Sequence, residues 1–331
     1  MILATALLPV LLFLTALITL DSYKLVRFRH VLAAIAAGGV LAVACYAVHF
    51  ALVSAVPIPS SVYARYLAPL VEECAKAVLI VALVRSHRIG FLVDAAIYGF
   101  AIGSGFAVVE NVYYWSTLSG ATFTLWLVRG FGTAVMHGGT TAIFAMAGKA
   151  LSDAENLPRG AGWAGALALV TFIHSIYNHF FLSPIFSTAL ILLVLPPLMY
   201  AVFKKSEAAL ETWLNVGFDA DTELLELMLS GRLSETPVGV YLQSIRSHFR
   251  PEVVVDMLCY LRLHLELSLR AKGLLMMREA GFEIALDPAD AAKLEEIDFL
   301  EGSIGPTGRL AMAPFLRESA KDRWQLSLLR R

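Results

Sequence analysis

Residues 62–84 read VYARYLAPLVEECAKAVLIVALV, an apolar run that places Glu72, Glu73 and Lys76 near its middle. The run is long enough to cross a membrane, because a spanning helix needs about 20 apolar residues. An ionisable side chain at that depth costs roughly 2.5–3.5 kcal/mol, so such groups persist mainly where they face a protein interior and carry out chemistry or transport. This stretch therefore predicts a membrane helix that contributes to a buried functional site.

The composition of the whole chain also indicates a membrane protein. Of its 331 residues, 58% are hydrophobic, and the mean hydropathy of +0.70 exceeds that of an ordinary soluble domain. Residues 1–205 hold 12 Lys/Arg and 7 Asp/Glu, whereas residues 206–331 hold 14 and 20. A membrane-spanning region does not tolerate the charge density of the second part. We therefore predict an all-α protein with a transmembrane helix bundle at 1–205 and a soluble helical cytosolic domain at 206–331.

Seven apolar segments of near-spanning length divide the first part of the chain. Basic residues cluster in the loops after the first, third, fifth and seventh segments, whereas the other loops lack Lys and Arg. Basic loops stay on the cytosolic side, so we expect a multi-pass protein of the cytoplasmic membrane with its N-terminus outside and its C-terminal domain in the cytosol. The segments are residues 1–20, 31–54, 62–84, 91–116, 122–148, 161–182 and 185–203.

Three later segments carry polar groups that could join the carboxylates of the first block. Glu110 follows a series of glycines at 99–105, which would let neighbouring helices approach closely. His137 and His174 lie in the next two segments, and Asn178 shares a helix face with His174. Imidazoles and carboxylates from separate helices suit either a zinc-activated water or a metal-free water activated by a carboxylate. The spacing of these residues does not decide between the two.

Within the first block, Glu72 and Lys76 are four residues apart, so they share a helix face and Lys76 is the expected counter-ion. Glu73 projects about 100° away from Glu72, so the two carboxylates are expected to divide the roles of general base and positioning group. Cys74 is a poor candidate nucleophile, because two adjacent anions disfavour a thiolate. Arg129 is expected to pair with an acid or to reach the outer interface.

The order of these blocks resembles that of the PrsW family of intramembrane proteases, distant relatives of the type II CAAX prenyl endopeptidases and the Abi proteins. The resemblance covers roughly residues 62–182. In the prenyl-protease relatives the second block ends in His, whereas this chain has Glu110, which leaves that carboxylate as either a metal ligand or a second acid. The matching blocks are Glu72-Glu73-x-x-Lys76, Phe106-x-x-x-Glu110-Asn111, His137, and His174 with Asn178.

The resemblance implies an intramembrane endopeptidase that cuts membrane-anchored proteins, as in the regulated cleavage of anti-sigma factors. Its partners would be a single-pass or membrane-anchored protein substrate and the lipid bilayer, with no nucleic acid. The resemblance leaves the use of a metal open: zinc is the candidate cofactor, and a metal-free mechanism is the alternative. The expected topology puts the cut in the outer half of the membrane.

The resemblance also assigns roles to individual residues. Glu72 is the expected general base, with Glu73 beside it, and Asn178 is the expected hydrogen-bond donor to the developing oxyanion. The implied catalytic residues are Glu72, Glu73, Glu110, His137, His174 and Asn178, and the implied supporting residues are Lys76 and Asn111. His137 and His174 would act as oxyanion stabilisers or as metal ligands, and the candidate metal ligands are Glu110, His137 and His174.

A proton-coupled transporter or channel is the main alternative, because carboxylates and imidazoles in a membrane also form proton relays. The sequence shows no pair of related halves, as many transporters do, and seven helices divide poorly into halves. A scaffold that only anchors the soluble part would leave the buried polar groups unexplained. In that soluble part we expect helices, with a turn-rich loop at 302–308 before the last one and no recognisable chemistry.

Overall fold

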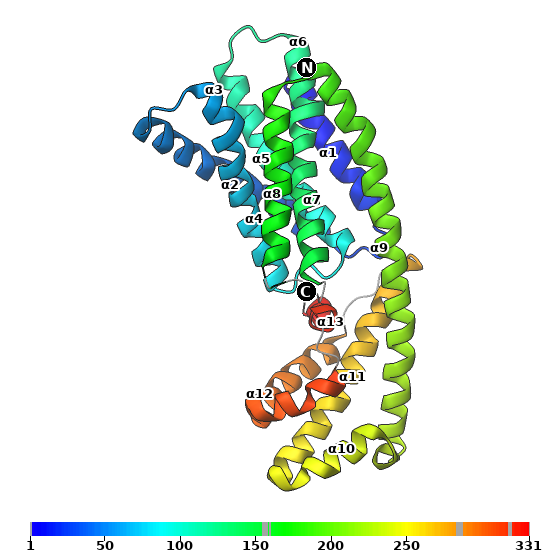
Figure 1. Cartoon of the computed structure of the whole chain (residues 1–331). Coiled ribbons are helices and arrows are strands. Elements are labelled where there is room, and N and C mark those ends of the chain that lie inside the picture. Colours follow the sequence, from blue (N-terminus) through cyan, green and yellow to red (C-terminus); the bar gives the residue numbers. More distant parts are fainter. Residues whose placement is uncertain (1, 154–157, 159, 283–286, 317–319, 331) are drawn as a thin grey trace. The chain divides into compact units, whose positions relative to one another are not determined.

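The computed structural model describes residues 2–153, 158, 160–282, 287–316 and 320–330, and these residues form helices with no strand among them (Figure 1). The all-helical prediction is therefore confirmed for the described residues. The chain divides into two compact units, Met1–Glu207 and Ala208–Arg331. The assignment of residues 1–205 to the membrane and of residues 206–331 to the cytosol remains a prediction.

Each of the seven predicted apolar segments of the first unit is helical over most of its length. Two segments contain a short π-helical stretch, which we label η1 and η2. The elements are α1 (Ile2–Leu20), α2 (Phe28–Ala55), α3 (Ser60–Val62), η1 (Tyr63–Leu67), α4 (Ala68–Arg85), α5 (Leu92–Thr117), α6 (Phe123–Leu127), η2 (Val128–Thr133), α7 (Ala134–Ser152), α8 (Ala161–His179) and α9 (Pro184–Leu229).

Three helices of the described chain are long and apolar enough to cross a membrane, as judged by length and composition. They are α2, α5 and α9, and α1 contains a shorter apolar helix, Ala4–Leu20. Because a spanning helix needs about 20 predominantly apolar residues, these helices fit a multi-pass protein. The count of seven crossings stays a prediction.

Helix α5 forms the centre of the first unit, where it packs against α1, α2 and α7. Its residues from Val93 to Ala107 are buried. Small residues make this possible, since a Cβ at Gly103 would lie 2.7 Å from Cα of Gly138 and closer still to the carbonyl oxygen of His137. The expected close approach at these glycines is thus confirmed, and it sets α7, with His137, directly against α5.

The second unit contains the part of α9 from Ala208 onward, α10 (Pro237–Ile245), α11 (Pro251–Glu279), α12 (Pro288–Leu316) and α13 (Ala320–Leu329), with short 3₁₀ turns at Leu233–Glu235 and Arg246–His248. The turn-rich loop expected at 302–308 is instead a kink within α12, at Gly305 with φ 66° and ψ −179°. Pro306 explains the kink, because it disfavours a helical conformation in the residue before it. Inside this unit, the Lys272 ammonium donates to Asp221 Oδ2 at 2.6 Å, a buried ion pair that the sequence did not indicate.

Candidate active site

Glu73 of α4 is the most enclosed acid of the first block, with 2% of its surface exposed. Its Oε1 accepts hydrogen bonds from Lys76 Nζ at 2.7 Å and from His174 Nδ1 at 2.8 Å. The sequence had paired Lys76 with Glu72, but Lys76 forms its ion pair with Glu73, three residues away. Glu73 therefore joins α4 to α8 and fixes the orientation of the His174 ring.

Glu72 points to a different environment. Its Oε1 lies 3.3 Å from Nε2 of His49, a residue of α2. Its Oε2 is buried and has no hydrogen-bond partner in the part of the chain that the structure describes. A buried carboxylate oxygen without a partner loses its hydration without compensation, so such an atom calls for a ligand such as a cation or a bound water.

His137 of α7 occupies the middle of the cluster. Its Nδ1 lies 3.3 Å from Lys76 Nζ, and its Nε2 lies 3.1 Å from Glu110 Oε2. Its ring meets that of His174 edge to face, with centroids 4.9 Å apart. Because α4, α5, α7 and α8 each supply one or more of these groups, residues more than 100 positions apart in the sequence meet at one point.

Arg129, from η2, neutralises Glu110. Its guanidinium lies 3.3 Å from Glu110 Oε2 and 3.9 Å from the centre of the Tyr114 ring. The expectation that Arg129 pairs with an acid is confirmed. Its Nε also donates to Asn111 Oδ1 at 2.8 Å, and the Asn111 amide donates to the carbonyl of Ala6 at 2.8 Å, so Asn111 links α5 to α1 and η2.

Glu72, His137 and His174 could hold a metal ion together. One ligand atom of each lies within 4.8 Å of those of the other two. Oxygen and two imidazole nitrogens form a donor set that zinc accepts. The bond from His174 Nδ1 to Glu73 leaves its Nε2 for a metal, which is the carboxylate–histidine arrangement of many zinc sites. With the unpartnered Glu72 Oε2, the residues present therefore fit a metal; Glu110, an expected ligand, contacts His137 but does not belong to this group of three.

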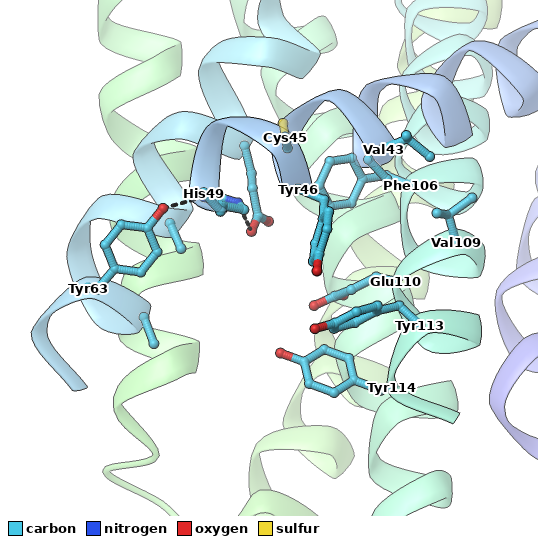
Figure 2. Close-up of a pocket in the computed structure, with 14 residues that line it drawn as sticks. Val43, Cys45, Tyr46, His49, Tyr63, Phe106, Val109, Glu110, Tyr113 and Tyr114 are labelled. Atoms are coloured by element: carbon cyan, nitrogen blue, oxygen red, sulfur yellow. Dashed lines mark hydrogen bonds and ion pairs between the residues drawn. The ribbon is translucent and has the colours of Figure 1, made fainter. Parts of the chain in front are cut away.

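A cavity of about 410 Å³ opens beside the cluster, with both Glu72 and Glu110 in its wall. In Figure 2, Glu110, Tyr113 and Tyr114 project into it from α5, and Tyr46 faces them from α2. The rest of the wall is largely apolar. The cavity can thus admit a hydrophobic segment next to the carboxylates. The other lining residues are Ala42, Val43, Cys45, His49, Tyr63, Ala64, Ala68, Phe106 and Val109.

The π-helical stretch η1 is held by side chains of α8. A π turn interrupts the regular helical hydrogen bonding and is frequent at functional sites. Ser175 Oγ donates to the carbonyl of Arg65 at 2.6 Å, and Asn178 Nδ2 donates to the carbonyl of Ala64 at 3.0 Å. Asn178 therefore bonds to η1 and lies outside the cluster, and its oxyanion role stays a prediction.

The structure brings most of the predicted residues into one connected set: Glu72, Glu73, Lys76, Glu110, His137 and His174. Sequence reasoning did not include His49. The available signal was a single imidazole in the otherwise apolar segment 31–54. That signal is weak on its own, because polar residues in membrane helices also serve as simple packing partners.

Comparison with known protein families matches residues 26–203 to the PrsW family intramembrane metalloprotease. The match covers more than half of the chain and includes every residue of the cluster. No curated protein and no solved structure matches the chain significantly. This chain belongs to the PrsW family of intramembrane metalloproteases.

Proposed function

We propose that this protein hydrolyses a peptide bond of a membrane-anchored protein, with a metal ion held by Glu72, His137 and His174. The observation that carries the proposal is the convergence of these three side chains within 4.8 Å. The adjoining cavity and the family match support it. A substrate segment in the cavity would lie against two carboxylates and the metal ligands.

Glu72, His137 and His174 would hold the ion, which would supply Lewis-acid activation of water and polarisation of the scissile carbonyl. In our proposal, Glu110 takes the proton of the attacking water and returns it to the leaving amine, because its carboxylate lies in the cavity wall. Arg129 orients that carboxylate through their ion pair. Glu73 and Lys76 hold the His174 ring in place.

These roles differ from those inferred from the resemblance, in which Glu72 is the general base and Glu110 is either a metal ligand or a second acid. We assign Glu72 as the ligand and Glu110 as the base because Glu72, and not Glu110, belongs to the three-residue ligand group. In a metal-free mechanism, Glu72 would keep the role of general base. Removal of the metal separates the two mechanisms.

The remaining parts of the proposal concern the membrane. We propose that residues 1–205 cross it seven times as the protease domain, with the N-terminus outside and residues 206–331 in the cytosol. The substrate would be a single-pass or otherwise membrane-anchored protein, cut in the outer half of the bilayer. The apolar, tyrosine-rich wall of the cavity suits a hydrophobic segment of such a substrate.

The test is cleavage of a single-pass membrane protein by the purified full chain in detergent. We expect Glu72→Gln and His174→Ala to reduce the rate by about 100-fold or more, the scale of losing a principal catalytic group. His179→Ala is the matched control, because His179 lies on the same helix and bonds to Tyr66 at 3.0 Å instead of to the cluster. Full activity in the Glu72 and His174 variants would contradict the proposed site, and no cleavage of any membrane substrate would favour the transporter.

A further inference from the structure

His49 of α2 lies outside the catalytic blocks and links Glu72 of α4 to Tyr63 of η1. Its Nε2 lies 3.3 Å from Glu72 Oε1, and its Nδ1 lies 2.5 Å from the hydroxyl of Tyr63 (dashed lines in Figure 2). The side chain is 20% exposed and lines the cavity. A chain of hydrogen bonds thus runs from η1 through α2 to the carboxylate on α4.

When the His49 ring is neutral, only one arrangement of hydrogen-bond donors satisfies both the Tyr63–His49 and the His49–Glu72 contacts. If the Tyr63 hydroxyl donates to Nδ1, the ring proton is on Nε2 and can be donated to Glu72. The reverse tautomer would set the lone pair of Nε2 against a carboxylate oxygen. Glu72 Oε1 is therefore occupied by His49, which leaves the buried and unpartnered Oε2 as the oxygen available to a cation.

We propose that His49 is a positioning residue that orients Glu72 for metal binding, with Tyr63 fixing its tautomer. This inference rests on the proposed function, because it takes Glu72 as a ligand. His49 itself stands outside the group of ligand atoms that lie within 4.8 Å of one another. A residue that forms a hydrogen bond to a metal ligand orients that ligand and raises the metal affinity of the site. Its loss typically lowers the metal affinity by about 10–100-fold.

Tyr63 belongs to η1, and contacts between η1 and α8 connect the His49–Tyr63 hydrogen bond to α8 as well. Tyr63 begins η1, and the next two residues of η1 offer their carbonyls to Ser175 and Asn178 of α8. His174, one of the proposed ligands, lies on the same helix. The position of His49 is thus coupled to both the α4 and the α8 side of the proposed metal site.

The experiment measures metal affinity instead of turnover. The full-length protein in detergent is stripped of metal and titrated with Co²⁺, whose visible spectrum reports the ligand field, and then with Zn²⁺ in competition. We expect His49→Ala to weaken binding by about 10–100-fold. His49→Gln should restore most of the affinity, because the amide can still donate to Glu72, and Tyr63→Phe should cause a smaller loss. His179→Ala, which removes another histidine that bonds to a tyrosine, should bind as the wild type does.

A double-variant comparison separates positioning from a general effect on folding. In a Glu72→Gln background, His49→Ala should cause no further loss, since the residue that it positions is already changed. Wild-type affinity in His49→Ala would overturn the inference, and so would a loss that persists in His49→Gln or that adds fully to Glu72→Gln. A wild-type protein that binds no metal would instead refute the proposed function itself.

Discussion

At the scale of single residues, the two neighbouring acids of α4 have different environments. Glu73 is enclosed and shares its Oε1 between Lys76 and His174. Glu72 lines the cavity and keeps one oxygen without a partner in the described chain. We therefore expect the two to differ when they are substituted: loss of Glu73 should lower stability as well as metal binding, because Glu73 also orients His174, whereas loss of Glu72 should lower metal binding with little change in stability.

Glu73→Leu should lower the free energy of unfolding by roughly 3–5 kcal/mol, because it leaves the Lys76 ammonium buried without its counter-ion. Glu72→Leu should change the free energy of unfolding by less than about 1 kcal/mol, since Glu72 pairs with the partly exposed His49 and not with a buried ammonium. Equilibrium unfolding in detergent measures both. The double replacement Glu73→Leu with Lys76→Met should recover most of the lost free energy of unfolding. Equal losses of stability for Glu72→Leu and Glu73→Leu would contradict the expected difference between the two acids.

The kinds of residue in the site could be predicted from the sequence, but their pairing could not. Glutamates, histidines and a lysine inside apolar segments can be recognised from the sequence alone. The spacing rule favoured Glu72 for Lys76, yet the ammonium lies with Glu73, where His174 of a distant helix adds a second donor. His49 and the orientation of Asn178 depend on contacts between α2, η1 and α8, which local periodicity does not encode.

At the scale of elements, close packing of α5 determines where His137 lies. A Cβ at Gly103 would collide with the backbone of α7 at His137 and Gly138. Backbone atoms cannot move aside as a flexible side chain can, so the helices must separate to accept even one methyl group. The glycine thus contributes to the geometry of a site that it does not touch chemically.

Gly103→Ala should lower the free energy of unfolding by roughly 1–3 kcal/mol, the usual cost of overpacking. It should also weaken metal binding, because displacement of α7 moves His137. Gly165→Ala is the matched control, since a Cβ at that position on α8 meets nothing within 4 Å. Thermal unfolding and the Co²⁺ titration measure the two effects, and unchanged metal affinity in a destabilised Gly103→Ala protein would refute the link to His137.

The helices themselves were predictable, because each apolar segment of near-spanning length is helical over most of its extent. The π-helical stretches η1 and η2 were not, since an apolar segment does not show where a helix takes an extra residue into one turn. Both supply groups near the site, through Tyr63 and Arg129. In the second unit, Gly305 and Pro306 marked an interruption correctly, but it is a kink in α12 and not a loop.

At the scale of the whole molecule, the family match and the proposed chemistry both lie in the first compact unit. The match ends at residue 203, and that unit ends at Glu207. Residues 208–331 form a separate unit outside the match, with a leucine-rich core of their own. The proposed site therefore takes every catalytic group from the first unit. We expect it to bind one metal ion per chain.

The most direct test of a single catalytic metal site is to count the metal ions bound to the purified full chain and to measure cleavage as the ions are removed and returned. We expect one ion per wild-type chain, none in His174→Ala, and cleavage that stops with a chelator and resumes when Zn²⁺ is added back. Full cleavage by wild-type protein that has been shown to be metal-free would contradict the proposed metal site and would return Glu72 to the role of general base.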